Sequence, residues 1–286
     1  MSKKKRSATP VDDLAQSCLN KRQALSQLKR KMRAFDLHFR TSKQEIFYKE
    51  LSKNDLTFCA GPAGSGKTYI AVTYALQALA DRHNPVDGIV ITKPLVEAAG
   101  EKIGFLPGDI DEKTDPFMMS YWCNMQKLID REVLNVLTYS KVIEVIPMAY
   151  MRGVTLDNKI IILDEAQNAT TDQMKMLLTR IGDKSKYIIC GDIEQTDRKN
   201  TNGLLDGLLR FSNMDNVGIC TFDHEDIVRN PLISKVLERY KLEIPSRDIE
   251  QFGTIGDGAG ELSELYYKFF NNLKKNDISS VNKVNK

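Results

Sequence analysis

The residues of this chain with the clearest chemical potential form a glycine-rich run that ends in lysine and threonine. The run has the pattern G-x-x-x-x-G-K-[ST] and lies between an apolar segment, 56–60, and an amphipathic one, 67–80. Glycines allow backbone N–H groups to wrap around a phosphate, and the helix that follows adds about half a positive charge at its N-terminus. We therefore expect a nucleotide site made by Gly61-Pro62-Ala63-Gly64-Ser65-Gly66-Lys67-Thr68 and the adjacent Tyr69.

A second run, 159–163, is apolar and ends in two carboxylates, Asp164 and Glu165. Such a run suits a strand that is buried on both faces, and ligands of open α/β sheets bind at the carboxyl ends of the strands. In the phosphate run, Lys67 would reach the β- and γ-phosphates of ATP and the hydroxyl of Thr68 would ligate Mg²⁺. Asp164 would hold the same ion through water, and Glu165 would polarise the water that attacks the γ-phosphate.

A third apolar run, 186–190, leads into a polar turn that contains Asp192 and Gln195. A glutamine at the end of a neighbouring strand could donate a hydrogen bond to the γ-phosphate or to the attacking water. We therefore include Gln195 among the catalytic candidates. Taken alone, the same residues are typical of an ordinary polar turn.

These runs belong to a regular alternation of short apolar and longer amphipathic segments that begins at residue 55. The alternation is typical of βαβ units and predicts an α/β fold with a mostly parallel sheet. Leucines at helical spacing predict an amphipathic helix, or two, within 12–35. The predicted strands are 56–60, 88–92, 142–146, 159–163, 186–190 and 216–221, and the predicted helices are 67–80, 115–130, 171–182, 203–212 and 230–240.

The predicted elements divide the chain into three parts. A basic helical arm covers 1–40, an α/β domain covers 41–245, and a linker, a short helix near 261–273 and a disordered tail fill 246–286. The first forty residues hold eleven Lys and Arg against three acids, although the whole chain carries only +3. This asymmetry is typical of a nucleic-acid-binding arm, and equally of a solvated helix with a polar tail.

Composition narrows the classes of protein. No stretch approaches the ~20 apolar residues of a membrane span, so we expect no membrane partner. The five cysteines are scattered without a Cys-x-x-Cys pair, which argues against a disulfide framework and against a zinc site. A reducing cytoplasm is the expected location, or the host cytoplasm if the chain is viral.

Several motifs together resemble the PhoH-like ATPases, which are related to the first RecA-like domain of superfamily 1 helicases. The resemblance rests on Gly61–Thr68, Asp164–Asn168 and Gly191–Gln195, and more specifically on 92–98, 100–109, 150–158 and Ile227–Leu232. It covers about 41–241 and is similar to the compact versions found in bacteriophages. It implies a P-loop NTPase with a RecA-like, mostly parallel sheet flanked by helices and an N-terminal helical arm, which hydrolyses ATP with Mg²⁺.

The resemblance also assigns single residues. Gln44 falls where the helicase relatives carry an adenine-reading glutamine, with an ordinary surface glutamine as the alternative. Lys93 stands where the family usually has arginine, which keeps the charge but loses the bidentate fork. Helicases of superfamily 1 close ATP between two RecA-like domains, and we expect room for only one here. The arginine finger would then come from a neighbouring subunit or from Arg229, for which a structural salt bridge is equally plausible.

The resemblance implies a homo-oligomer, with a hexameric ring as the favoured form. The leading function is an ATP-driven motor on single-stranded nucleic acid, with RNA favoured. The residues that would bind the phosphate backbone are Lys93, Lys102 and Arg198. The aromatic residues Phe105, Tyr121 and Trp122 would either stack on bases or pack in the core. The alternative is a nucleotide-gated switch or assembly ATPase that acts on a protein. A small-molecule kinase is disfavoured because no acceptor-binding lid is recognisable and a second acid suits water as nucleophile.

Overall fold

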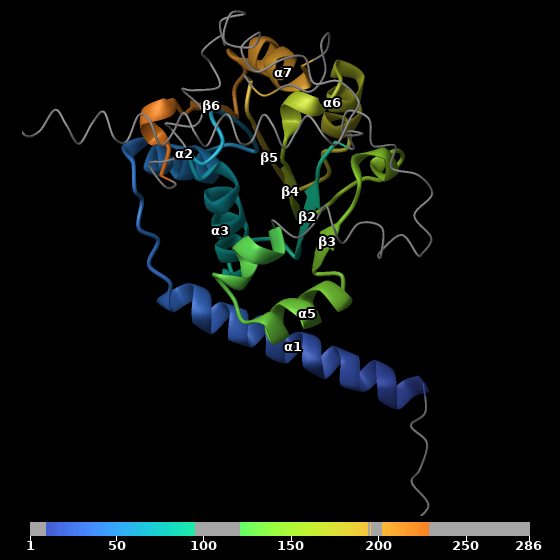
Figure 1. Ribbon diagram of the computed structural model, residues 1–286. Helices are drawn as coiled ribbons and strands as arrows, with labels where there is room; N and C mark the ends of the chain where they lie inside the picture. Colours follow the sequence, from blue (N-terminus) through green and yellow to red (C-terminus); the bar gives the residue numbers. More distant parts are fainter. Residues whose placement is uncertain (1–9, 95–120, 194, 196–201, 229–286) are drawn as a thin grey trace, which may run out of the picture. The chain divides into compact units, whose positions relative to one another are not determined.

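The chain folds around a parallel six-stranded sheet, shown in Figure 1. The structure is a computed structural model that describes residues 10–94, 121–193, 195 and 202–228, all within the compact unit Met1–Arg229. The strand order is β3-β2-β4-β5-β1-β6. The strands are β1 (Leu56–Ala60), β2 (Gly88–Thr92), β3 (Ile143–Val145), β4 (Lys159–Leu163), β5 (Lys186–Gly191) and β6 (Val217–Thr221).

The inner strands are buried on both faces, as their uninterrupted apolar sequences predict. Every residue of β1 and β2 is buried, and so are all residues of β4 and β5 after the first. The edge strand β6 instead alternates between buried and partly exposed positions. All pairings between these strands are parallel, so their carboxyl ends meet at one edge.

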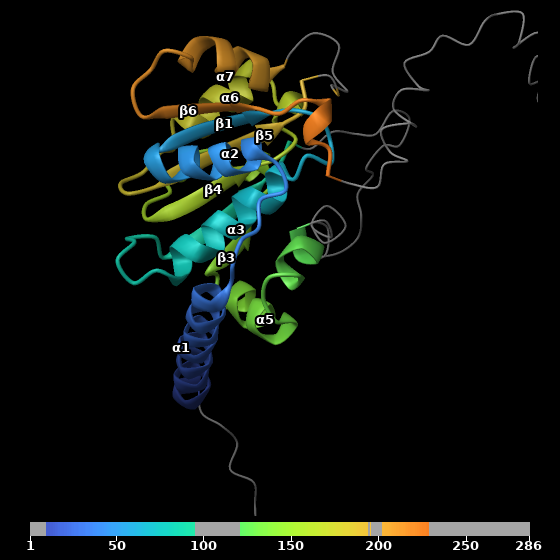
Figure 2. The same cartoon turned by 90° about the vertical axis from the view of Figure 1, so that its left-hand side faces the viewer.

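Helices cover both faces of the sheet. The helices are α1 (Pro10–Ala34), α2 (Ser42–Lys53), α3 (Lys67–Ala80), α5 (Arg131–Tyr139), α6 (Thr171–Leu178) and α7 (Gly203–Phe211). One hydrophobic cluster joins the first four of these helices to Ile89, Ile160 and Ile162, and the other joins α6 and α7 to Val90 and Ile161. Figure 2 shows the resulting layers, with α6 and α7 on the opposite side of the sheet from α2 and α3.

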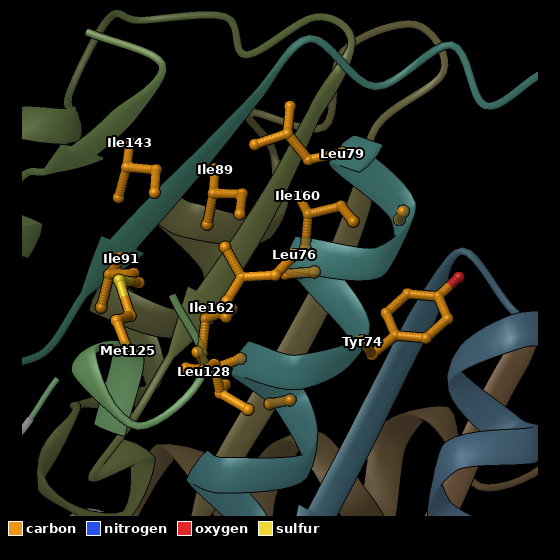
Figure 3. Close-up of a cluster of buried hydrophobic side chains, with 14 of the residues drawn as sticks. Tyr74, Leu76, Leu79, Ile89, Ile91, Met125, Leu128, Ile143, Ile160 and Ile162 are labelled. Carbon is orange, nitrogen blue, oxygen red and sulfur yellow. The ribbon is translucent and has the colours of Figure 1, made fainter. Parts of the chain in front are cut away.

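The core beside α3 consists mainly of branched aliphatic side chains. Figure 3 shows Leu76 and Leu79 of α3 directed at isoleucines of β2 and β4, among them Ile89 and Ile160. Met125 extends this cluster from the helical residues 121–126. The second half of this helix is therefore packed against the sheet.

Helix α1 packs against α3 and α5 and is part of the compact unit. Its buried side chains recur every fourth residue, at Ala24, Leu28 and Met32. Lys31 also forms an ion pair of 2.9 Å with Asp130. The helix predicted within 12–35 is confirmed.

None of the described helices is long and apolar enough to cross a membrane.

Two helices were not predicted, and one is shorter than expected. In α2 the buried positions are Gln44, Phe47 and Leu51, a stripe too narrow to stand out in a polar sequence. The nine-residue helix α5 was also missed. Helix α6 ends at Leu178 rather than at 182, because residues 179–185 turn back and Ile181 pairs with Leu156. The helices expected at 230–240 and 261–273, the boundary at 245 and the tail lie outside the described residues.

Candidate nucleotide-binding site

The glycine-rich run forms a tight loop between β1 and α3. Gly64 and Gly66 adopt positive φ angles of 90° and 88°, a region that side-chain-bearing residues rarely occupy. A Cβ atom on Gly66 would lie 2.8 Å from Nε2 of Gln44. The loop is therefore a close-fitting backbone cradle that requires glycine, which is the property expected of a phosphate site.

Lys67 is buried at the first position of α3. Its Nζ donates hydrogen bonds to the carbonyl oxygens of Gly61, at 2.7 Å, and Pro62, at 2.8 Å. The ammonium group therefore lies within the loop, where a positive charge would meet a bound phosphate. A lysine buried at this position suits the binding of a phosphate better than a lysine exposed to solvent.

Thr68 connects the loop to the acidic pair. Its Oγ1 donates to Oδ2 of Asp164 over 2.9 Å, and the backbone N–H of Glu165 donates to Oδ1 of Asp164 over 3.1 Å. A hydroxyl and a carboxylate are hard oxygen donors of the kind that Mg²⁺ prefers. No cluster of three or more His, Cys, Asp or Glu able to hold a metal occurs among the described residues. The hydroxyl of Thr68 and the carboxylate of Asp164 fit an Mg²⁺ ion whose other ligands are water and phosphate oxygens.

Glu165 is held in place by a chain of hydrogen bonds. Its backbone adopts a left-handed conformation with φ 54°, which is uncommon for a residue other than glycine and is often found at functional sites. Nε2 of Gln167 donates to Oε2 of Glu165 at 2.7 Å, and Oε1 of Gln167 accepts the N–H of Asp192 at 2.9 Å. Oδ2 of Asp192 then accepts the N–H of Ala63 at 3.2 Å. This series of hydrogen bonds connects the ends of β4 and β5 to the loop.

The surroundings of Glu165 raise the pKa of its carboxyl group. Burial raises its pKa above the usual value, and the carboxylate of Asp164 raises it further. The hydrogen bond from Gln167 and the charges of Lys67 and Lys93 act in the opposite direction. A raised pKa makes a carboxylate a better proton acceptor, and perturbed values of this kind cluster at functional sites.

Lys93 lies beside the acidic pair. Strand β2 pairs with β4, and the N–H of Asp164 donates to the carbonyl of Thr92 at 3.1 Å, so Lys93 follows directly at the same edge. Partial burial lowers the pKa of Lys93, and the charges of Glu165 and Asp164 counteract this shift. Its predicted contact with nucleic acid stays a prediction, but its charge also acts on the candidate catalytic carboxylate.

Tyr121 is a site residue whose role sequence reasoning did not identify. It is 1% exposed, and its hydroxyl donates to Oδ2 of Asp164 at 3.1 Å. Burial and the nearby Asp164 raise the pKa of this hydroxyl well above its usual value, so it remains a donor. Of the two alternatives expected for Tyr121, core packing is the one observed. No local pattern could have indicated the bond, because 43 residues separate the partners.

The sequence of this chain is similar to those of known proteins. The PhoH-like protein family matches residues 36–241 of the chain. The chain belongs to this family. It is 44% identical over 204 residues to a PhoH-like protein of Synechocystis, covering 71% of this chain and 61% of that protein. A PhoH-like protein of Bacillus subtilis is 42% identical over 206 residues, covering 71% and 64%. The chain thus spans about three fifths of the length of these curated relatives.

Solved structures with a similar fold are more distant than the PhoH-like relatives. The large terminase of a thermophilic bacteriophage aligns with a TM-score of 0.40 and 12% identity, covering 72% of this chain and 51% of the terminase. The Pif1 helicase of Candida albicans aligns with a TM-score of 0.36 and 14% identity, covering 76% and 47%. The sheet of this PhoH-like chain confirms the predicted fold class by itself, since all its described pairings are parallel and helices flank both faces.

Gln44 lies against the phosphate loop of this PhoH-like domain. It is buried, its Nε2 donates to the carbonyl of Ser65 at 2.9 Å, and its Oε1 accepts the N–H of Arg40 at 2.9 Å. Arg40 in turn donates to the carbonyl of Val228 at 3.1 Å, and the N–H of Val228 donates to the carbonyl of Gly64 at 3.1 Å. The surface alternative for Gln44 is therefore wrong, and adenine reading stays a prediction.

The remaining predicted residues are less well defined. Gln195 is exposed on the turn after β5, where its N–H donates to the carbonyl of Asp192 at 3.3 Å. Pro62 and Ser65 are buried and Tyr69 is partly buried in the loop and first turn of α3. Four predicted residues lie outside the described parts of the chain, namely Lys102, Phe105, Arg198 and Arg229.

Proposed function

We propose that this chain is a Mg²⁺-dependent ATP hydrolase that works as a homo-oligomer, with a hexameric ring as the favoured form, on single-stranded nucleic acid and preferentially on RNA. The observation that carries the hydrolase is the hydrogen bond between Thr68 and Asp164. It joins the phosphate loop to the acidic strand end, which are the two parts that phosphoryl transfer to water requires.

Each side chain of the site has a distinct part in this reaction. Lys67 supplies positive charge inside the loop, and Thr68 and Asp164 would hold Mg²⁺. Glu165 accepts the proton of the attacking water, for which its raised pKa suits it. Mg²⁺, when bound, neutralises charge on the phosphate oxygens. Gln44, which packs against the loop, would contact the adenine. Gln195 would contact the γ-phosphate or the attacking water.

The proposed oligomer rests on the positive charge that phosphoryl transfer needs opposite the γ-phosphate. An arginine finger contributes about 10³-fold or more to phosphoryl transfer, so a protomer without one should be nearly idle. Arg229 or an arginine of a neighbouring subunit would supply it. Heterologous contacts that close on themselves generate a ring, which places one such arginine at every site.

Lys93 supports nucleic acid as the target, because it follows β2 at the edge where the phosphate loop lies. Lys102 and Arg198 are the other candidate cations that the sequence offers. A groove of cations can follow a phosphate backbone without reading its sequence. Cys59, Cys123, Cys190 and Cys220 are free, which supports a location in the cytoplasm, or the host cytoplasm for a viral chain.

The test is ATP hydrolysis by the full chain with and without single-stranded RNA and DNA, at two salt concentrations. Glu165→Gln removes the proton acceptor and should abolish turnover while ATP still binds. Glu132→Gln, the same change at an exposed position in the first turn of α5, is the matched control and should behave as wild type. Because backbone contacts release counterions, stimulation by RNA should weaken at the higher salt concentration.

The outcomes separate the parts of the proposal. Hydrolysis that depends on Glu165 but ignores both polynucleotides would contradict the nucleic-acid target and favour a switch acting on a protein. Hydrolysis that is equal in wild type and Glu165→Gln would contradict the site itself. A chain that is monomeric by sedimentation yet fully active would contradict the ring.

A further inference from the structure

The buried hydroxyl of Tyr121 has no role in the hydrolase described above. The tyrosine ring lies in the core, in the same helical segment, 121–126, as Met125, which Figure 3 shows against the sheet. Its hydroxyl donates to Oδ2 of Asp164 at 3.1 Å, and Thr68 donates to the same oxygen at 2.9 Å. Two hydroxyls from different elements therefore converge on one carboxylate oxygen.

Core packing alone does not explain this arrangement. A phenylalanine would fill the same volume without bringing a polar group into the core, and burying a hydroxyl is unfavourable unless it is hydrogen-bonded. The partner of the hydroxyl is the carboxylate that would face Mg²⁺, and hydrogen bonds to charged groups are stronger than neutral ones. The bond therefore fixes the orientation of Asp164.

The other contacts of Asp164 leave this task to Tyr121. Oδ1 accepts the N–H of Glu165, which is on the same strand end and moves with it. Thr68 would itself ligate the ion, so it belongs to the site that must be organised. Tyr121 is the contact that comes from outside both the loop and β4, from the helical segment 121–126, which packs in the same hydrophobic cluster as Ile160 and Ile162 of β4.

We propose that Tyr121 is a positioning residue for the magnesium site, which orients the carboxylate of Asp164 toward the ion. The inference rests on the proposed hydrolase but makes a separate claim. Hydrogen-bonding partners behind metal ligands typically contribute about 10- to 100-fold to metal affinity or activity, so we expect about a tenfold effect here.

The experiment measures how much Mg²⁺ tightens the binding of ADP to the full chain. The dissociation constant is determined by calorimetry in Mg²⁺ and in EDTA, and their ratio is compared between variants. Tyr121→Phe should lower this ratio about tenfold and leave binding in EDTA unchanged, because the ring still packs. The fluorescence of Trp122, the single tryptophan of the chain and the neighbour of Tyr121, is an independent signal for the same titration.

Two further variants give the test its controls. Tyr187→Phe removes a buried hydroxyl that has no hydrogen-bond partner among the described residues, and it should leave the ratio unchanged. Asp164→Asn should lower the ratio by itself. Adding Tyr121→Phe to Asp164→Asn should have little further effect, since coupled residues are not additive.

Each remaining outcome overturns the inference. A wild-type ratio in Tyr121→Phe would show that the hydroxyl does not position Asp164. Weaker ADP binding in both Mg²⁺ and EDTA would assign Tyr121 a structural role only. Wild-type chain that binds ADP no better with Mg²⁺ than without it would overturn the proposed magnesium site as well, and this result is visible before any variant is made.

Discussion

Replacing Gln167 with methionine tests the hydrogen-bond chain behind Glu165. Gln167 is 1% exposed and joins two strand ends, because its amide donates to Glu165 at 2.7 Å and accepts the N–H of Asp192 at 2.9 Å. Methionine is close to glutamine in shape but can make neither bond. We expect Gln167→Met to reduce both the stability of the domain and the rate of ATP hydrolysis.

The loss of stability comes mainly from Asp192. Its buried N–H loses the acceptor Oε1 of Gln167, and the loss of a buried hydrogen bond of this kind costs about 1–3 kcal/mol. The bond between Gln167 and Glu165 is only partly buried, so water replaces part of what is lost and its share is about 0–1 kcal/mol. The free energy of unfolding should therefore fall by about 2 kcal/mol, which corresponds to roughly 4–8 °C in Tm for a domain of this size.

The loss of activity comes from Glu165. Without the amide of Gln167, its carboxylate is free to rotate, and a misplacement of about 1 Å can reduce a rate about 10²-fold. We expect at least about a tenfold lower kcat, measured by phosphate release. Gln27→Met, the same substitution at an exposed position of α1, should change neither quantity.

A double-mutant cycle with Glu165→Ala makes the reasoning refutable. If Asp192 dominates the loss, Gln167→Met should destabilise the wild type and Glu165→Ala by the same amount, within about 0.5 kcal/mol. A loss that disappears in the Glu165→Ala background would show that the carboxylate bond dominates instead. Unchanged stability together with unchanged kcat would refute the role of Gln167 altogether.

Two further substitutions test the helix packing and the phosphate loop. Leu28→Ala truncates a side chain on the buried face of α1 that is only 1% exposed. It should lower the free energy of unfolding by about 2–4 kcal/mol. Arg22→Ala on the exposed face should stay within about 0.5 kcal/mol, and equal melting curves would contradict the packing of α1. Gly66→Ala should abolish tight ATP binding, because its Cβ would displace the amide of Gln44. Gly153→Ala, at φ 85° with open space around its Cβ, carries the same backbone strain and should bind ATP normally in the same calorimetric assay.

The sequence predicted the regular elements wherever a local pattern was strong. The bounds of β1, β2, β4 and α3 are as predicted, since each is an uninterrupted apolar run or follows the glycine-rich loop directly. Helix α2 escaped prediction because its buried stripe includes a glutamine, Gln44, and few apolar residues. Burial of Gln44 depends on the carbonyl of Ser65 and the N–H of Arg40, which no reading of α2 alone could supply.

The sequence by itself predicted the candidate chemistry of this protein, and the tertiary structure decided the geometry of the candidate site. Gly61–Thr68 and the pair Asp164 and Glu165 are recognisable because phosphate and magnesium require particular residues at fixed spacing. The strand order β4-β5-β1 brings Asp192 beside the loop, and core packing brings the hydroxyl of Tyr121 to Asp164. Such contacts join residues far apart in the chain, so they depend on how the layers pack rather than on any local sequence pattern.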